Sequence, residues 1–232
     1  MFVEITDIID ESPRVKRFVL STLDGSGIEF LPGQFVTIYN RRLPEFSNTR
    51  SYSIASSNTC SNSIELCIAL NENGLFTPWL FQINKGEQLE ISEPQGQFIY
   101  KQEYAQFPNV FVCTGTGVAP FLSMIKSALN NGESSVYLVF GNRKFGDILY
   151  REYFESLSVE YPNFHFVPVL SQEDSIVNKG YVHEYYASIL RDIGGDARIF
   201  VCGWKNMCSE TRDKLKQMGY NRRQYFFEQY DS

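Results

Sequence analysis

Hydrophobic and polar residues alternate in short segments over the first hundred positions of the chain. Residues 63–70 alternate regularly, and residues 31–39 and 85–91 combine turn residues with β-forming ones. Several short strands at this spacing are typical of a β-sandwich or a β-barrel. One short helix is predicted over residues 76–83, with Thr77 as its N-cap.

The pattern changes near Tyr104–Pro108, after which continuous apolar segments alternate with amphipathic ones. Strands are predicted at 110–113, 135–140, 164–170, 198–202 and 224–228, and helices at about 118–130, 147–158, 182–192 and 205–217. Apolar strands that alternate with helices are typical of a parallel sheet covered on both faces. We therefore predict two domains, an antiparallel β-barrel over residues 1–105 and a doubly wound, five-stranded parallel α/β domain over residues 106–232.

Charge and hydropathy narrow the possible functions. The 232 residues include 21 Lys and Arg against 27 Asp and Glu, and the resulting net charge of −6 disfavours binding to nucleic acid. Apolar runs are far shorter than the roughly 20 residues that cross a bilayer, and the N-terminal segment is acidic where a signal peptide is basic. We expect a cytoplasmic monomer that binds neither nucleic acid nor a membrane.

Histidine and cysteine are too scarce and too dispersed for a metal centre. The chain has two histidines and five cysteines, with no Cys-x-x-Cys pair and no spacing typical of an iron–sulfur loop. We therefore expect no metal site. Any redox chemistry of this protein then requires an organic cofactor.

A glycine loop follows the first strand of the parallel half. Residues 110–120 read VFVCTGTGVAP, with Gly115, Thr116 and Gly117 in the loop and Pro120 at the start of the next helix. Glycines allow a tight turn and a close approach of the backbone to a ligand, and the N–H groups of a helix N-terminus suit a pyrophosphate. The pattern favours a dinucleotide phosphate site over its alternative, a plain strand-to-helix turn.

Together with two other segments, this loop resembles the ferredoxin–NADP⁺ reductase family. The segments are Arg50-Ser51-Tyr52-Ser53, the loop from Gly115 to Pro120, and Cys202-Gly203-Trp204-Lys205-Asn206-Met207 with Glu228-Gln229-Tyr230 after it. They occur in the family order, and the resemblance extends over essentially the whole chain. It implies a flavoprotein that binds FAD on the barrel and NADPH or NADH on the α/β domain.

The resemblance implies a role for each residue of the first segment. Arg50 would bind the FAD pyrophosphate, Tyr52 would lie along the isoalloxazine ring, and Ser53 would hydrogen-bond near flavin N5. Gly74 and Thr77 would hold the FAD phosphates at the start of the short helix. The predicted FAD-binding set also includes Ser51, Ile68 and Tyr230, the last as the aromatic residue that covers the flavin. Taken singly, these segments also fit an ordinary strand end, a plain helix cap and a final sheet strand.

The resemblance also implies the catalytic and nucleotide-binding residues. Cys202 would meet the nicotinamide, and Glu228 would relay a proton or balance charge, so the predicted catalytic residues are Ser53, Cys202 and Glu228. The predicted NAD(P)-binding set is Thr114, Gly115, Thr116, Gly117, Pro120, Arg143, Ser171, Lys179, Tyr181, Cys202, Gly203 and Met207.

Few charges bear on the choice between NADPH and NADH. Lys179 and Tyr181 match positions that contact the 2′-phosphate in the family, whereas Gln172 replaces an Arg and Glu173 follows it. Glu173 would repel a phosphate, and Arg143 would offset that repulsion. The sequence slightly favours NADPH.

The resemblance implies hydride transfer between NAD(P)H and bound FAD, and electron transfer between FAD and a separate carrier such as ferredoxin or flavodoxin. Two alternatives are an NAD(P)H-dependent free-flavin reductase and a non-catalytic flavin- or nucleotide-binding subunit of an electron-transfer or regulatory complex. Stoichiometric FAD in the purified protein argues against the first alternative. Turnover of NAD(P)H argues against the second.

Overall fold

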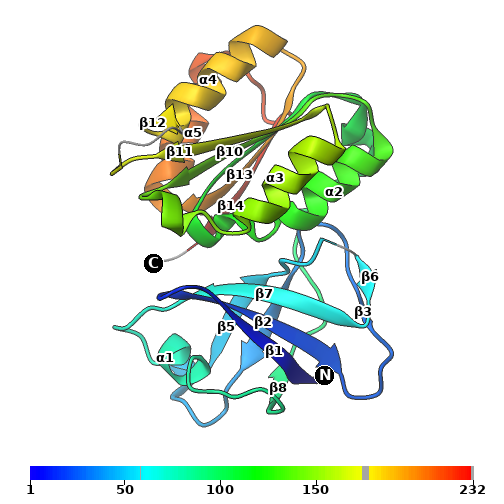
Figure 1. Cartoon of the computed structure of the whole chain (residues 1–232), viewed down its shortest axis with the longest axis vertical. Coiled ribbons are helices and arrows are strands. Elements are labelled where there is room, and N and C mark those ends of the chain that lie inside the picture. Colours follow the sequence, from blue (N-terminus) through cyan, green and yellow to red (C-terminus); the bar gives the residue numbers. More distant parts are fainter. Residues whose placement is uncertain (58, 174–177, 231–232) are drawn as a thin grey trace. The chain divides into compact units, whose positions relative to one another are not determined.

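A computed structural model describes residues 1–57, 59–173 and 178–230 (Figure 1). The chain divides into two compact units. The barrel unit comprises Met1–Ile99 and Ala119–Met124, and the α/β unit comprises Tyr100–Val118 and Ile125–Ser232. Each unit has its own sheet and its own hydrophobic core.

The barrel unit is built on a six-stranded antiparallel sheet in the order β5-β4-β8-β1-β2-β7. Its strands are β1 (Phe2–Ser12), β2 (Val15–Thr22), β4 (Phe35–Tyr39), β5 (Thr49–Ser53), β7 (Ser63–Ala69) and β8 (Gln88–Ile91). A bridge between Ile54 and Leu66 links the ends of the series, β5 and β7, and closes the barrel. The strands β3 (Ile28–Glu29) and β6 (Cys60–Ser61) pair separately, and η1 (Glu45–Ser47) is a single 3₁₀ turn.

Alternate residues of the strands fill the barrel core. Ile64, Leu66 and Ile68 are buried there, which confirms the inward face predicted from their spacing. The hairpin of β1 and β2 was not assigned from the sequence, although Phe18 and Leu20 are core residues. A β-bulge after Ile5 interrupts the period-two pattern of β1, which hides the strand from a reading based on alternation.

Helix α1 (Phe76–Leu80) is shorter than predicted, and the expected N-cap is wrong. Leu75 occupies the N-cap position, and no side chain caps the helix. The hydroxyl of Thr77 is instead bound to Asn71, because it accepts from the Asn71 N–H at 2.9 Å and donates to the Asn71 carbonyl at 3.2 Å. Thr77 therefore closes the turn before the helix.

The α/β unit contains a six-stranded sheet in the order β12-β11-β10-β9-β13-β14, with all neighbours parallel. Its strands are β9 (Asn109–Thr114), β10 (Val136–Asn142), β11 (Phe164–Leu170), β12 (Asn178–Lys179), β13 (Arg198–Trp204) and β14 (Tyr225–Tyr230). The five predicted strands are all present. The sixth, β12, has two residues and was too short to predict.

Helices cover both faces of this sheet, as predicted (Figure 1). They are α2 (Phe121–Asn131), α3 (Arg151–Glu160), α4 (Val182–Ile193) and α5 (Lys205–Gln217). Leu190 of α4 and Leu215 of α5 belong to the core cluster on one face, and Phe154 of α3 packs against Phe164 and Phe166 on the other. Among the described residues, no helix is long and apolar enough to cross a membrane.

Two helices begin later than predicted because 3₁₀ turns precede them. Residues Gly115–Val118 form the turn η3 before α2, and Phe145–Asp147 form η4 before α3. A further 3₁₀ turn, η2 (Gln102–Gln106), precedes β9. These turns sit where the chain leaves or approaches the sheet.

The strand order places a topological switch point beside β9. Strand β10 lies on one side of β9 and β13 on the other, so successive crossovers run in opposite directions from this strand. Ligands of such sheets bind at the carboxyl ends of the strands, where the order reverses. The residues that follow β9 and end β13 therefore lie at the expected ligand edge, which we call the carboxyl edge.

Candidate functional site

The first candidate residues lie on strand β5 of the barrel unit. Register partners on β4 are Val36 for Tyr52 and Phe35 for Ser53. Arg50 is exposed, and its guanidinium donates to the Thr49 carbonyl at 2.6 Å and lies 5.9 Å from the centre of the Phe76 ring. No carboxylate of the described residues forms an ion pair with Arg50, so its charge is available to an anion.

Tyr52 carries a buried hydroxyl group that has no hydrogen-bond partner among the residues that the structure describes. Burial raises the pKa of Tyr52 well above its ordinary value, against the opposing effect of Arg50. A buried polar atom without a partner costs about 1–3 kcal/mol. FAD fits this pair of residues, because it offers a pyrophosphate to Arg50, and a flat ring and polar groups to Tyr52.

The other predicted FAD-binding residues of this unit differ in accessibility. Ser51 shares a hydrogen bond with Thr37 through the two hydroxyl oxygens, 2.9 Å apart. Gly74 and Thr77 both bind Asn71 and so belong to one turn. Ile68 lies in the barrel core and does not offer its side chain to a ligand.

In the α/β unit, two of the predicted glycines are required by the protein's own packing. A Cβ atom at Gly117 would overlap with the Cys202 carbonyl group, and one at Gly203 would lie 2.6 Å from Thr114 Oγ1. The end of β13 therefore packs directly against the glycine loop. We predicted that these glycines leave room for a ligand, and for Gly117 the structure gives a different reason, contact with β13. Gly115 has φ +52°, and no heavy atom lies near its Cβ direction, so glycine is favoured here by the left-handed backbone of the turn and not by packing.

The hydroxyl oxygen of Thr114 is buried beside Gly203 and has no hydrogen-bond partner. This oxygen lies at the carboxyl edge, between the strand end and the glycine loop. A nucleotide bound along Gly203 would supply the missing partner. The unpartnered hydroxyl therefore fits a dinucleotide at the switch point, whereas the two closely packed glycines are explained by contacts within the protein.

Three of the predicted residues meet at the ends of β13 and β14. Cys202 is fully buried, is the register partner of Glu228, and its Sγ lies 3.9 Å from Glu228 Oε2. The Tyr230 hydroxyl also forms a hydrogen bond with the Cys202 thiol. Ser53, the third predicted catalytic residue, belongs to the barrel unit.

The electrostatics of this cluster keep Cys202 protonated. Burial raises the pKa of the Cys202 thiol well above its ordinary value, and the neighbouring Glu228 raises it further. A thiolate is the nucleophilic form of cysteine. Cys202 therefore acts as a hydrogen-bond donor to Glu228 and not as a nucleophile.

The remaining predicted residues lie along the carboxyl edge. Arg143 follows β10, Lys179 ends β12, and Ser171 follows β11 and donates its N–H to the Asn142 carbonyl at 3.0 Å. Tyr181 is 61% exposed. Met207 lies in the first turn of α5 and packs partly against the core, and Pro120 directly precedes α2.

The sequence analysis missed two features of this edge. His183 stacks beneath Tyr181, with ring centres 5.7 Å apart and an angle of 6° between the planes. Glu173 accepts a hydrogen bond from the Phe145 N–H at 2.7 Å, and the Gln172 N–H donates to the Arg143 carbonyl at 3.0 Å. The two-residue spacing of Tyr181 and His183 in the sequence does not predict that their rings stack, because the stacking depends on how the chain turns into α4.

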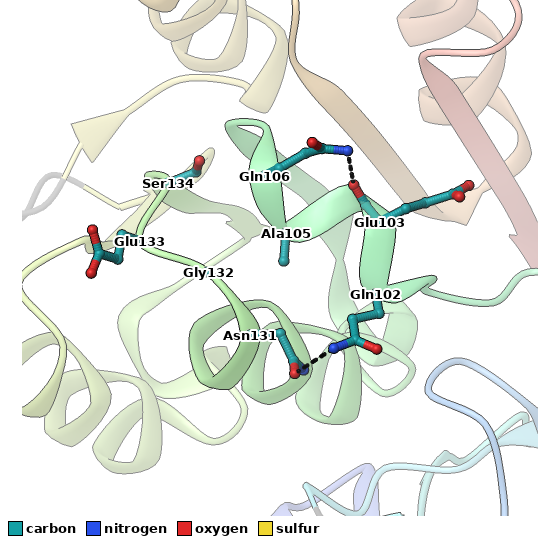
Figure 2. A pocket seen from close by; sticks show the side chains of 8 residues that line it. All are labelled: Gln102, Glu103, Ala105, Gln106, Asn131, Gly132, Glu133 and Ser134. Atoms are coloured by element: carbon teal, nitrogen blue, oxygen red, sulfur yellow. Dashed lines mark hydrogen bonds between the residues drawn. The ribbon is translucent and has the colours of Figure 1, made fainter.

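One polar cavity lies elsewhere in the α/β unit. It has a volume of about 680 Å³ and is open and polar. Figure 2 shows its lining residues, Gln102, Glu103, Ala105, Gln106, Asn131, Gly132, Glu133 and Ser134. These residues precede β9 and β10, at the opposite end of the strands from the carboxyl edge. None of the predicted site residues lines this cavity, so its size gives no support to the nucleotide site.

Two family models match the chain. A model described as an oxidoreductase FAD-binding domain matches residues 3–100, and one described as an oxidoreductase NAD-binding domain matches residues 111–213. These matches and the two sheets define the class of protein, an oxidoreductase that binds FAD and a nicotinamide nucleotide.

Individual proteins are similar over nearly the whole chain. The phenol hydroxylase P5 protein of Acinetobacter pittii is 34% identical over 219 residues, which cover 92% of this chain and 60% of that protein. Ferredoxin–NADP reductase B of Sorangium cellulosum is 29% identical over 229 residues, 95% of this chain and 93% of that protein. This chain thus spans about three fifths of the first relative and nearly all of the second.

A solved structure shares the fold. The crystal structure of a ferredoxin NADP⁺ reductase from Neisseria gonorrhoeae with bound FAD and NADP matches with a TM-score of 0.85 at 19% identity, over 99% of this chain and 98% of that one. The two domain models and the similarity to ferredoxin–NADP reductase B support the resemblance to the ferredoxin–NADP⁺ reductase family that the motifs predicted.

Proposed function

We propose that this protein transfers hydride between NAD(P)H and bound FAD, and electrons between FAD and a separate carrier such as ferredoxin or flavodoxin. FAD is assigned to residues 1–105 and the nicotinamide nucleotide to residues 106–232. The observation that carries the proposal is the Cys202–Glu228–Tyr230 cluster beside the glycine loop at the switch point. The names of the two relatives, a phenol hydroxylase component and a ferredoxin reductase, support a role as a reductase for another redox protein.

On the barrel unit, we assign Arg50 and Tyr52 to the main contacts with FAD. The exposed guanidinium of Arg50 binds the pyrophosphate through charge-assisted hydrogen bonds. Tyr52 packs its ring against the flavin and gives its unpartnered hydroxyl to a polar group of the cofactor. Ser51, Ser53, Gly74 and Thr77 contribute further polar contacts. FAD, when bound, accepts two electrons at once and releases them singly.

On the α/β unit, the loop of Gly115, Thr116 and Gly117 binds the pyrophosphate through its N–H groups. Thr114 completes its hydrogen bonding with the nucleotide beside Gly203. Along the carboxyl edge we assign the outer part of the nucleotide to Arg143, Ser171, Lys179 and Tyr181. Met207 shapes one end of the site. Pro120, which follows the glycine loop in the chain, is also assigned to nucleotide binding.

The cluster at the ends of β13 and β14 orients the nicotinamide. Cys202 packs against the ring while its proton stays on sulfur and is donated toward Glu228. The negative charge of Glu228 stabilises the positive charge that develops on the nicotinamide when hydride leaves. Tyr230 contributes a further hydrogen bond to the thiol.

We also propose a cytoplasmic location. The support is that Cys113, Cys202 and Cys208 carry free thiols, because a reducing compartment keeps thiols unpaired.

An anaerobic absorbance experiment tests the proposed function. We expect the purified protein to carry one FAD that gel filtration does not remove, and the flavin absorbance to bleach when NADPH or NADH is added. A protein that is colourless and does not take up added FAD would contradict the proposal. FAD that is lost on the column but consumed in turnover would identify a free-flavin reductase instead.

A further inference from the structure

Two aromatic side chains of the described α/β unit are largely exposed, and both lie at the carboxyl edge. Tyr181, just after β12, is 61% exposed, and Trp204, the last residue of β13, is 57% exposed. Four strand spacings separate β12 from β13, about 19 Å at about 4.8 Å each. An extended dinucleotide has its two ring systems at opposite ends of a similar span, with the pyrophosphate between them.

Trp204 occupies a position where helix stability favours a different residue. It is the N-cap of the 13-residue helix α5, and no side chain caps that helix. Ser, Thr, Asp and Asn are preferred at this position because they accept hydrogen bonds from the first free N–H groups. Trp does not, and its indole is left exposed. Such a local conflict between sequence and structure is typical of a functional position.

The neighbours of Trp204 belong to the nicotinamide end of the proposed site. Trp204 is the register partner of Tyr230, as Cys202 is of Glu228, so these four residues share one face of β13 and β14. Cys202 and Trp204 are two positions apart on β13, which places their Cα atoms about 6.6 Å apart along the strand. This Cα–Cα distance is about the width of one aromatic ring, so a ring in contact with the Cys202 side would also reach Trp204.

We propose that Trp204 is a binding residue for the nicotinamide nucleotide half of the dinucleotide, with its indole face against the nicotinamide or its ribose. This inference rests on the proposed function, because it takes the carboxyl edge as the NAD(P) site. The indole face attracts cations more strongly than other aromatic rings do, and oxidised nicotinamide carries a positive charge. The contact is therefore stronger for NAD(P)⁺ than for NAD(P)H.

Equilibrium binding to the oxidised holoprotein tests this assignment without turnover. Calorimetric titrations compare NADP⁺ and NAD⁺ with 5′-AMP and 2′,5′-ADP, which lack the nicotinamide half. We expect Trp204→Ala to weaken NAD(P)⁺ binding about 3- to 10-fold and Trp204→Phe less than 3-fold. The affinity for 5′-AMP and 2′,5′-ADP should be unchanged in both variants.

Fluorescence provides a second measurement, because the only other tryptophan, Trp79, lies in α1 of the barrel unit. In a Trp79→Phe background the emission comes from Trp204. We expect NAD(P)⁺ to quench this emission and 5′-AMP to leave it unchanged. Quenching by both ligands to the same extent would contradict a contact with the nicotinamide half.

A variant that adds a cap separates binding from stability. Trp204→Ser should raise Tm by about 2–4 °C, because Ser caps α5, and should weaken NAD(P)⁺ binding as much as Trp204→Ala does. A lower Tm together with unchanged affinity would show that Trp204 has a structural role and would overturn the proposal. Unchanged affinity with slower electron transfer to a carrier protein would also overturn it, in favour of a docking contact. If the wild-type protein binds no nicotinamide nucleotide, the proposed function itself fails.

Discussion

The two units present their candidate residues in different ways. In the barrel unit the main residues, Arg50 and Tyr52, lie on one strand. Among the described residues, the Arg50 guanidinium forms no ion pair and the buried Tyr52 hydroxyl has no hydrogen-bond partner. In the α/β unit the residues come from several strand ends and contact one another, as Cys202, Glu228 and Tyr230 do.

This difference indicates two kinds of site. The residues proposed for FAD form a surface whose hydrogen bonding the cofactor would complete, whereas those proposed for the nucleotide form a site that is largely built before a ligand arrives. Substitutions in the barrel unit should therefore change cofactor affinity more than folding. Substitutions in the tightly packed loop of the α/β unit should change folding as well.

The largest effect is expected for Gly117→Ala. The new Cβ would overlap with the Cys202 carbonyl group, and backbone cannot move aside as a flexible side chain does. We expect a loss of about 2–3 kcal/mol in the free energy of unfolding, measured by urea denaturation. Gly115→Ala is the control, because its new Cβ would contact no heavy atom. The left-handed backbone at this position alone should lower the free energy of unfolding by about 1 kcal/mol. Equal losses for the two variants would contradict the packing of β13 against the loop.

The next largest effect is expected on the affinity for FAD. Arg50→Ala removes a cation that forms no ion pair among the described residues, and should weaken FAD binding about 10- to 100-fold, as expected for a charge-assisted hydrogen bond. Urea denaturation of the apoprotein should be nearly unchanged, because the Arg50 side chain is exposed. Retention of stoichiometric FAD by this variant through gel filtration would show that the segment is not the pyrophosphate site.

Tyr52→Phe sharpens the same comparison. It removes the unpartnered hydroxyl, so the apoprotein should gain about 1 kcal/mol of stability while FAD binding weakens severalfold. Thermal denaturation with and without FAD measures both changes. A loss of apoprotein stability would mean that the hydroxyl already has a partner in the absence of FAD.

A smaller effect is expected for Glu228→Gln. The amide keeps the shape of the side chain and its hydrogen bond with Cys202 but lacks the charge. Flavin reduction followed by stopped flow should slow about 10-fold, while the Kd for the nucleotide changes less than 3-fold. Glu184→Gln, on the exposed side of α4, is a matched control. An unchanged reduction rate would reject a catalytic role for this carboxylate.

The smallest effect is expected on the preference for NADPH over NADH. The sequence slightly favours NADPH, and the carboxylate of Glu173, held by the Phe145 N–H, opposes a 2′-phosphate near Arg143. Glu173→Gln should therefore shift the ratio of kcat/KM for NADPH over NADH upward by about 3-fold. Arg143→Gln should shift it downward. A wild-type preference for NADH would show that Lys179 does not bind a 2′-phosphate.

The sequence alone predicted the class of each unit, because the periods of strands and helices are local properties of the chain. Alternation in residues 63–70 indicated a barrel strand, and apolar runs such as 110–113 indicated the buried strands of a parallel sheet. The strand–glycine–helix order around Gly115 indicated the nucleotide loop in the same way.

Tertiary structure decided what depends on residues far apart in the chain. The bulge in β1, the two-residue strand β12 and the bond of Thr77 with Asn71 leave no periodic signal. The close contact of Gly117 with Cys202 and the meeting of Cys202 with Glu228 join segments separated by 85 and 26 positions, respectively. Sequence patterns record which residues are buried, whereas strand order determines which buried residues become neighbours, and only the folded sheet fixes that order.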